Sequence, residues 1–432
     1  MNTAMLDKMW QERWNSVPTD EIRTAMQKLY ELYDAEGLVR FFASLWNGER
    51  GAFYYSHSAR DYEGYDVDAE STYQILNIMR NMGATAGIEG NDLRVMLGEE
   101  MSSKIIDFLK QMQDEGDEYF YNRQWRDSSS VMRVHRDLTQ VIKLFEWLAD
   151  KPLYKTPLER LSADNKSNAV YPEHITDLDT MREYVKDFTH AHTTEGWSNH
   201  LGSQTEMWTA SGLIQSVLDI LDGMQDAESG MWVVRKNEDS TYLAHDGRCE
   251  SEYGILTSSY KIAAIYNKSN RRINHPIKIV ENAIHAVMSE KIPETIPYLF
   301  NPWATLNYLR ANIVKHSPEL LSEYDRLIAE CGPKMIYNVA QKLGAFRKPD
   351  CSYSYYPDRS HPNIYRTPSS LGIYEGDVNG TLLAIKSISD AVAIAFGCGS
   401  PIPLFNYKHA KMFVDACRAQ TPPVKKPVPE NK

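Results

Sequence analysis

The amino-acid sequence predicts an all-α fold, a closed ring of about six helical hairpins known as an (α/α)6 toroid. Three observations lead to this prediction. Apolar residues recur at helical spacing in one segment after another. A short helix-ending motif with glycine and aromatic residues returns near positions 46, 113, 163, 226, 291 and 344. The returns are separated by roughly 50 to 70 residues, which is enough for two helices and their loops.

A ring is expected because a helical hairpin with one apolar stripe cannot bury that stripe alone. Stacked hairpins cover one another, and closing the stack leaves no exposed end. We therefore expect one toroid domain over residues 1–418. An open α-solenoid or a helical bundle is the alternative, but solenoid repeats are usually shorter and more regular than these.

The first repeat illustrates the unit. A helix over residues 21–46 is followed by a turn on Gly48 and Gly51, an aromatic run at 53–55, and a second helix that starts near Asp66. Further helices are expected over residues 91–112, 131–145, 177–190, 201–224, 250–266, 277–288, 303–315 and 324–343, with a last one after the EGDVN stretch. The tail at 419–432 is rich in Pro and Lys and is predicted to be disordered.

Composition limits the partners. The net charge of −11 disfavours a nucleic-acid binder, because such binding depends on clustered Lys and Arg. The N-terminus has no apolar core of signal-peptide type, and no run of about 18 apolar residues occurs, which predicts a cytoplasmic protein with no membrane partner. The oligomeric state stays open.

Cofactor motifs are missing from the sequence. Five cysteines are scattered without a CxxC pair, so neither a disulfide framework nor a structural zinc site is indicated. The phosphate-binding GxxxxGKS loop, the GxGxxG turn and the GxSxG elbow do not occur either. We therefore expect no cofactor and no metal.

The helix endings GMQDAESGMWV and QMQDEGDEYFY resemble those of terpenoid cyclases and protein prenyltransferase β subunits, and DVDAESTYQIL resembles the acidic inner-helix start of the same superfamily. The resemblance implies an α/α barrel with its cavity at the end where the inner helices begin. Similar barrels also house glycoside hydrolases and polysaccharide lyases.

The sequence departs from the isoprenoid enzymes at their reactive groups. The Asp-x-Asp-Asp acid of class II cyclases is incomplete, since Asp66, Val67 and Asp68 are followed by Ala69. The nearest match to the Asp-x-Cys zinc pair of prenyltransferases, from Asp246 to Cys249, is one residue too long.

Three acidic helix starts, DVDAE, RCESE and EGDVN, are the candidate sources of catalytic groups. Carboxylates at such positions commonly cap free N–H groups. Several carboxylates converging on one cavity would instead raise one another's pKa and provide an acid and a base. Since glycoside hydrolysis needs two carboxylates, we predict that acid and base come from Asp68, Glu252 and Asp377.

The other candidates come from the remaining inner-helix starts. The predicted substrate-binding residues are Asp66, Glu70, Tyr73, Trp208, Arg248, Glu250, Trp303, Asn307 and Asn379. Tyr73, Trp208 and Trp303 would stack on sugar rings. A lyase would instead need a Tyr or His base and a group that neutralises a uronic carboxylate. Asn199, His200, Tyr308 and Arg310 could provide that set.

We therefore predict a carbohydrate-active enzyme for a small-molecule or oligosaccharide substrate, a glycoside hydrolase first and a lyase second. An isoprenoid cyclase or transferase and a non-catalytic binding module are further alternatives. Cavity carboxylates about 5 to 10 Å apart would favour hydrolysis. An Asn, His, Tyr and Arg cluster without such a pair would favour elimination. An apolar aromatic cavity would favour an isoprenoid substrate, and the absence of a cavity would favour a scaffold.

Overall fold

The structure is a computed structural model of the whole chain, and it describes residues 20–88, 92–162, 171–187, 191, 193–232, 235–237, 242–243, 251–364, 367–395 and 402–429. Its α-helices are α2 (Asp20–Glu31), α3 (Ala35–Ser44), α4 (His57–Asp61), α5 (Ala69–Met79), α6 (Leu93–Leu97), α7 (Glu99–Met112), α8 (Val131–Trp147), α9 (Pro157–Ser162), α10 (Glu173–Thr176), α11 (Leu178–Lys186), α12 (Thr194–Ser211), α13 (Ile214–Met224), α14 (Glu252–Lys268), α15 (Pro276–Met288), α16 (Ile296–His316), α17 (Leu321–Phe346), α18 (Val378–Ala395) and α19 (Tyr407–Arg418). A π-helical turn η1 (Arg80–Ala84) extends α5, and two 3₁₀ turns are η3 (Arg123–Ser128) and η4 (Pro318–Leu320).

Short antiparallel ribbons make up the strands. They are β1 (Trp46–Asn47) with β2 (Ala52–Phe53), β3 (Arg235–Lys236) with β4 (Tyr242–Leu243), and β5 (Asn363–Ile364) with β6 (Thr367–Pro368). Within the ranges given above, none of the helices combines the length and the hydropathy that a membrane span requires.

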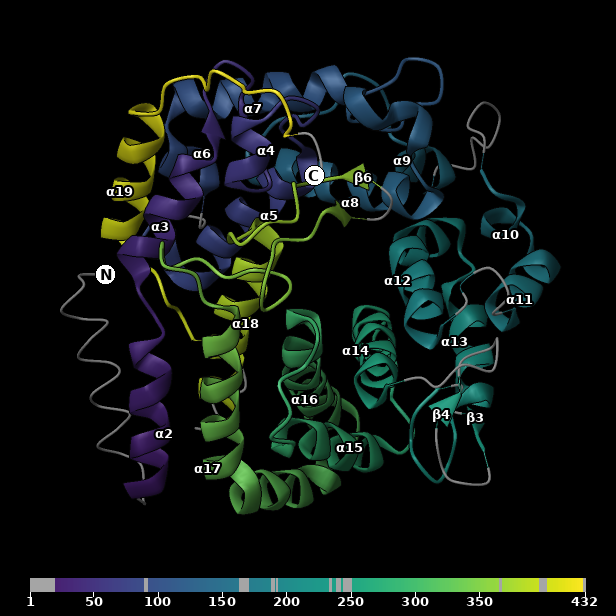
Figure 1. Cartoon of the computed structure of the whole chain (residues 1–432). Helices are drawn as coiled ribbons and strands as arrows, with labels where there is room; N and C mark the ends of the chain where they lie inside the picture. The colour runs from purple at the N-terminus through teal and green to yellow at the C-terminus, as the bar shows by residue number, and fades with distance from the viewer. Residues whose placement is uncertain are drawn as a thin grey trace.

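Six helices form a closed inner ring. Helix α5 packs on α8, α8 on α12, α12 on α14, α14 on α16, α16 on α18, and α18 returns to α5. These six helices surround the centre of the molecule in Figure 1. The ring closes through contacts between the first and the last inner helix, which are about 300 residues apart in the sequence.

The remaining helices form an outer layer. Helix α15 packs on α16 and α17, α17 packs on α16 and α18, and α2 lies along α17. Helix α13 packs on α11 and α12, and α19 packs on α3. Each inner helix is thus preceded in the sequence by an outer one, and the all-α toroid predicted from the sequence is confirmed.

The repeated motif is a turn that joins an outer helix to the following inner helix. In four of these turns a residue one or two positions after the end of the outer helix pairs with an aromatic residue: Trp46 with Phe53, Gln113 with Phe120, Gln225 with Trp232 and Arg347 with Tyr353. Each turn contains one residue with a φ between 66° and 72°. These residues are Gly51, Glu118, Gly230 and Cys351. The motif is therefore one backbone conformation used repeatedly, and the buried aromatic residue anchors it in the core.

Three predicted helices are divided in the structure. The helix predicted over 91–112 is interrupted at Gly98, whose φ of 78° separates α6 from α7. The predicted helix at 201–224 is wrong as one element, because Gly212 ends α12 with a φ of 81° and α13 begins at Ile214. A left-handed residue at this position is a common way to end a helix. The helix predicted over 21–46 is likewise split, since Asp34 caps a new helix by accepting a hydrogen bond from the Gly37 N–H.

The C-terminal segment lies on α4. Sequence composition predicts disorder after Arg418, whereas in the structure Nζ of Lys425 donates hydrogen bonds to the carbonyls of Ala59 (3.1 Å) and Tyr62 (3.2 Å). The Lys426 N–H donates to the carbonyl of Asp61 at 2.8 Å. A lysine that satisfies helix-end carbonyls is a C-cap that composition cannot reveal.

Candidate active site

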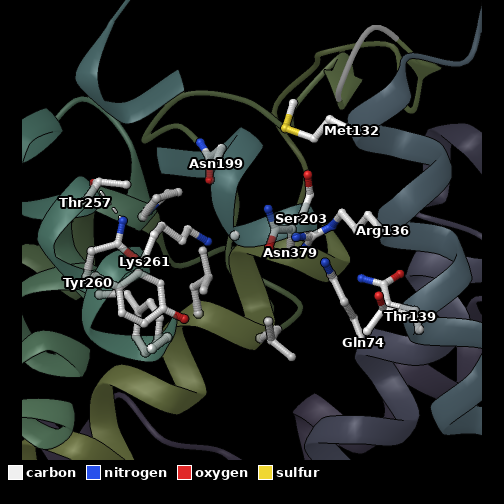
Figure 2. A pocket seen from close by; sticks show the side chains of 18 of the residues that line it. Gln74, Met132, Arg136, Thr139, Asn199, Ser203, Thr257, Tyr260, Lys261 and Asn379 are labelled. Carbon is white, nitrogen blue, oxygen red and sulfur yellow. Dashed lines mark hydrogen bonds between the residues drawn. The ribbon is translucent and has the colours of Figure 1, made fainter. Parts of the chain in front are cut away.

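The ring encloses one large cavity among the described residues, with a volume of about 490 Å³. Every inner helix contributes to its wall, and so does the loop between α17 and α18. The lining residues include Tyr73, Gln74, Arg136, Glu195, Asn199, Gly202, Ser203, Glu206, Thr257, Tyr260, Lys261, Phe300, Asn301, Tyr308, Tyr355, His361, Asn379 and Lys386. Figure 2 shows several of these side chains around the central space. The cavity size is typical of a small-molecule site.

Helical periodicity aims these side chains at the cavity. On α12, Glu195, Asn199, Gly202 and Glu206 follow at intervals of three or four residues, which places them on one face. The same spacing relates the lining residues of α14, such as Thr257 and Lys261. The inner helices therefore present polar stripes inward, where a simple helical core would be apolar.

Amide side chains form much of the polar lining. Asn301 donates a hydrogen bond from Nδ2 to the Thr257 hydroxyl at 2.8 Å, which fixes the orientation of its amide. Gln74 donates from Nε2 to Glu70 at 2.9 Å. Asn199 and Asn379 also line the cavity (Figure 2). Amides of this kind can donate to and accept from hydroxyl groups of a ligand.

Aromatic residues form one wall. The ring of Tyr260 lies 5.6 Å from that of Tyr308 and 5.7 Å from that of Phe300, measured between centroids. Burial raises the pKa of Tyr308 above its ordinary value, and the nearby Asp390 adds to the shift. Tyr73 stacks on Trp147 at 5.4 Å, and burial raises its pKa to about 12.

A histidine lies in the loop that covers the cavity. The imidazole of His361 packs edge-on against Tyr355, with centroids 4.2 Å apart. Burial, together with the charge of Arg359, lowers the pKa of His361 to about 4. Nδ1 of His361 accepts a hydrogen bond from the Asn363 N–H at 3.1 Å. The ring is therefore neutral at neutral pH, with its proton on Nε2.

Arg136 is held in the wall by a buried ionic network. Its Nε and Nη2 donate to the same oxygen of Glu70, at 2.8 and 2.6 Å, while Arg133 contacts the other oxygen. Arg133 also pairs with Asp137 at 2.9 Å. Burial alone would raise the pKa of Glu70, but the two guanidinium groups hold it below its ordinary value. The network positions one cation at the cavity surface.

The three predicted catalytic carboxylates do not line the cavity. Asp68 caps α5 by accepting from the Ser71 N–H at 2.7 Å, and Asp377 accepts from the Gly380 N–H at 2.7 Å at the start of α18. Burial raises the pKa of each to about 6. Glu252 pairs with His285 on the neighbouring outer helix at 2.7 Å. Both aspartates therefore act as helix caps, which is the alternative to a catalytic role that their positions at helix starts already allowed.

The predicted binding residues divide into three groups. Tyr73, Asn379 and Tyr308 line the cavity, and so does Asn199. The predicted residues that lie elsewhere are Asp66, Glu70, His200, Trp208, Trp303, Asn307 and Arg310. Asp66 pairs with Arg50, and His200 lies 3.5 Å from the Tyr184 hydroxyl. The predicted residues Arg248 and Glu250, and the Asp246 to Cys249 stretch, lie outside the described residues.

The two tryptophans predicted to stack on sugars belong to the core. Trp208 is fully buried, and its Nε1 donates to the carbonyl of His174 at 2.9 Å. Trp303 is 2% exposed. Large aromatic side chains fill the space between the helical layers, so the number of aromatic residues in the sequence does not indicate how many line the cavity.

The cationic side chains of the cavity wall were not predicted from the sequence. Arg136, Lys261 and Lys386 line the cavity but lie one turn or more beyond the helix starts. The sequence did contain an indication that Lys386 has a special role, because it is the single cation in the largely apolar stretch TLLAIKSISDAVAIA. Charged residues are rarely placed on buried helix faces without a partner.

The described residues include no group of three or more His, Cys, Asp and Glu side chains able to hold a metal ion. No protein-family model and no curated protein matches the sequence. Among solved structures, the chain is similar to an alpha-1,6-mannanase from Salegentibacter sp. HEL1_6, at 11% identity and a TM-score of 0.38. Inactive variants of that enzyme, in complex with alpha-1,6-mannotriose and alpha-1,6-mannotetrose, match at 9% and 10% identity with TM-scores of 0.40. Each match covers 85% of this chain and 99% of the other.

Proposed function

We propose that this protein is a carbohydrate-active enzyme that binds an oligosaccharide in the ring cavity and cleaves a glycosidic bond there. The observation that carries the proposal is the cavity itself, to which all six inner helices contribute mostly polar side chains. Amide groups and tyrosines on rigid helices suit a ligand rich in hydroxyl groups. An isoprenoid would need an apolar aromatic lining, and a scaffold would need no cavity.

The described carboxylates favour elimination over hydrolysis by a carboxylate pair. Glu195 and Glu206 are the two that line the cavity in the described part of the chain. They are 11 residues apart on α12, which at about 1.5 Å per residue separates them by about 16 Å along the helix axis. Paired glycosidase carboxylates stand about 5 to 9.5 Å apart. Glu206 is also engaged with Lys268 at 2.9 Å.

The tyrosine pair can supply both proton transfers of an elimination. A Tyr260 phenolate takes the proton from the sugar carbon next to a carboxyl group, and the electron pair of that C–H bond forms a C=C bond. The glycosidic C–O bond on the far side breaks, and the leaving oxygen takes the hydroxyl proton of Tyr308. Nζ of Lys261 lies 4.9 Å from the Tyr260 ring centroid, and a cation at this distance stabilises a phenolate.

Hydrolysis is the second candidate, and Glu195 favours it. Its carboxylate lies at the start of α12 on the cavity wall and accepts a hydrogen bond from the Tyr298 hydroxyl at 2.9 Å. In this reading Glu195 protonates the leaving oxygen or activates the attacking water.

A glycan panel distinguishes the two reactions. Elimination yields an unsaturated sugar that absorbs in the ultraviolet, whereas hydrolysis yields reducing ends without that absorbance. We expect unsaturated products, and we expect Tyr260→Phe and Tyr308→Phe each to lower kcat by about 10² to 10⁴. Tyr374→Phe, at an exposed site, is the control. Saturated products that depend on Glu195 would establish hydrolysis instead, and the absence of any cleavage would contradict the proposal.

A further inference from the structure

Four cationic side chains from the described ranges line the cavity; Lys268 is paired with Glu206, and the other three come from three different inner helices. Arg136 comes from α8, Lys261 from α14 and Lys386 from α18. Figure 2 shows the side chains of Arg136 and Lys261 pointing into the same space from opposite walls. Between them lie neutral donors and acceptors such as Ser203 and Asn379.

The two lysines share one aromatic support. Nζ of Lys261 lies 4.9 Å from the ring centroid of Tyr260, and Nζ of Lys386 lies 5.5 Å from that of Phe300. The two rings contact each other edge-on, with centroids 5.7 Å apart. Both ammonium groups therefore lie on a single pair of rings, and the ring faces compensate only part of the lost hydration.

Neither ammonium group is neutralised by the protein. In the described part of the chain, Lys261 and Lys386 make no hydrogen bond, and no carboxylate oxygen lies within 4.0 Å of either Nζ. Glu195 and Asp390 are near enough to favour the charged lysines, but they make no direct contact with them. Glu195 instead accepts from Tyr298.

The cations also disfavour one another. Burial lowers the pKa of Lys261 to about 8, with Arg136 and Lys386 contributing through repulsion. Burial and Arg136 lower the pKa of Lys386 as well. A partly buried, unpaired cation costs stability, and an apolar residue of similar length would remove that cost. The arrangement is unfavourable in the free protein and becomes favourable once an anion enters the cavity.

We propose that Lys261, Lys386 and Arg136 form a binding site for an acidic group, so that the substrate is an oligosaccharide carrying a carboxylate or a sulfate ester. This inference rests on the proposed function for the oligosaccharide, while the site itself requires only the cavity. An acidic group held between the two lysines lies beside Tyr260. A uronic carboxylate held there would be neutralised, which acidifies the neighbouring C–H bond that elimination must break.

Binding to the full-length protein tests the site separately from cleavage. The probes are three galactose-based oligosaccharides of equal length: oligogalacturonate, a sulfated galacto-oligosaccharide and the unsubstituted galacto-oligosaccharide. Titration calorimetry at low and at high salt gives each Kd. We expect at least one acidic probe to bind more tightly than the neutral one, with an affinity that falls as salt rises. The acidic probe that binds shows whether the site prefers a carboxylate or a sulfate.

Substitutions assign that binding to the lysines. Lys261→Met and Lys386→Met should each weaken binding of the acidic probe by about tenfold or more. Both variants should unfold at a temperature equal to or above that of the wild type, because an unpaired buried cation has been removed. A purely structural lysine would instead lower that temperature. Lys411→Met, at an exposed position on α19, is the matched control.

The outcomes separate the two proposals. The acidic site is overturned if no acidic probe binds more tightly than its neutral counterpart, or if both methionine variants keep the wild-type affinity. Tight binding of an acidic probe without cleavage of any glycan would support the site and contradict the enzymatic proposal. Cleavage of neutral glycans alone would support the enzymatic proposal and contradict the acidic site.

Discussion

Tyr55 and Asp377 join the first and the last hairpin of the ring: the Tyr55 hydroxyl donates a hydrogen bond to Oδ1 of Asp377 at 2.8 Å. The other oxygen of Asp377 accepts from the Tyr355 N–H at 2.7 Å, and Oδ1 also caps α18 through the Gly380 N–H. The Val378 N–H donates to the carbonyl of Tyr55 at 3.0 Å. Asp377 is therefore a closure point of the toroid, and its acceptors are already occupied.

Replacing this carboxylate should destabilise the ring. In Asp377→Asn, an amide NH₂ would face the backbone donors that the carboxylate accepts, leaving them unpaired. We expect the free energy of unfolding to fall by about 2 to 4 kcal/mol, measured by denaturant titration. Asp358→Asn, at an exposed site paired with Arg359, should change it by less than about 0.5 kcal/mol. Equal stability of the two variants would contradict a closure role.

Glu252 should be dispensable for activity. Its carboxylate pairs with the exposed His285 on α15 and does not line the cavity. We expect Glu252→Gln to keep kcat/KM within about twofold, since exposed ion pairs contribute about 0 to 1 kcal/mol. Glu195→Gln, at the cavity wall, is the comparison. A folded Glu252→Gln variant that loses activity would return Glu252 to the active site.

The shared turn conformation predicts a contrast between two glycines of positive φ. At Gly51 (φ 70°) a Cβ would lie 2.1 Å from the carbonyl oxygen of Lys104, while at Gly64 (φ 83°) it would meet no atom within 4 Å. Gly64→Ala should lower the free energy of unfolding only by the backbone strain, which is about 1 to 2 kcal/mol. Gly51→Ala should cost more than about 3 kcal/mol because of the added collision. Thermal unfolding of both variants checks this, and equal losses would mean that the turn relaxes freely.

Binding of an acidic glycan should depend on pH through Lys261. Its pKa is lowered to about 8 by burial and by Arg136, with Glu195, Lys386 and Glu70 as the other charged neighbours. The ammonium is present below this pH and lost above it, so affinity should fall as the pH rises through about 8. Lys261→Arg should remove the fall, because arginine keeps its charge. Calorimetry across this range measures it, and a flat wild-type profile would exclude Lys261 as the titrating cation.

The sequence allowed the ring to be predicted because its repeats carry a physical requirement. The turn needs a residue of positive φ, which is Gly51 or Gly230 in two repeats, followed by an aromatic residue for the core. Helical periodicity supplied the hairpins. The division between α12 and α13 was missed because Leu201 and Ile214 continue one apolar pattern across Gly212, and only backbone geometry shows that the chain turns there.

The site was less predictable because helix starts carry two signals at once. A carboxylate such as Asp68 satisfies free N–H groups whether or not a cavity is near, so its presence at a helix start did not identify a catalytic role. The cavity wall includes some helix starts, such as Glu195 on α12, but it extends several turns further along the inner helices. There the informative residues were the cations Lys261 and Lys386, which lie in the middle of α14 and α18.

The central claim is that the ring cavity holds the substrate, and filling the cavity tests it most directly. Gly202 lines the cavity on α12, and a Cβ at this position would meet no atom within 4 Å. Gly223, exposed on the outer helix α13, also has free space around a Cβ. The measurement is the affinity for the best-binding glycan of Gly202→Phe and Gly223→Phe, with circular dichroism to verify folding. We predict that binding is lost in Gly202→Phe and unchanged in Gly223→Phe; wild-type affinity in a folded Gly202→Phe variant would contradict the claim.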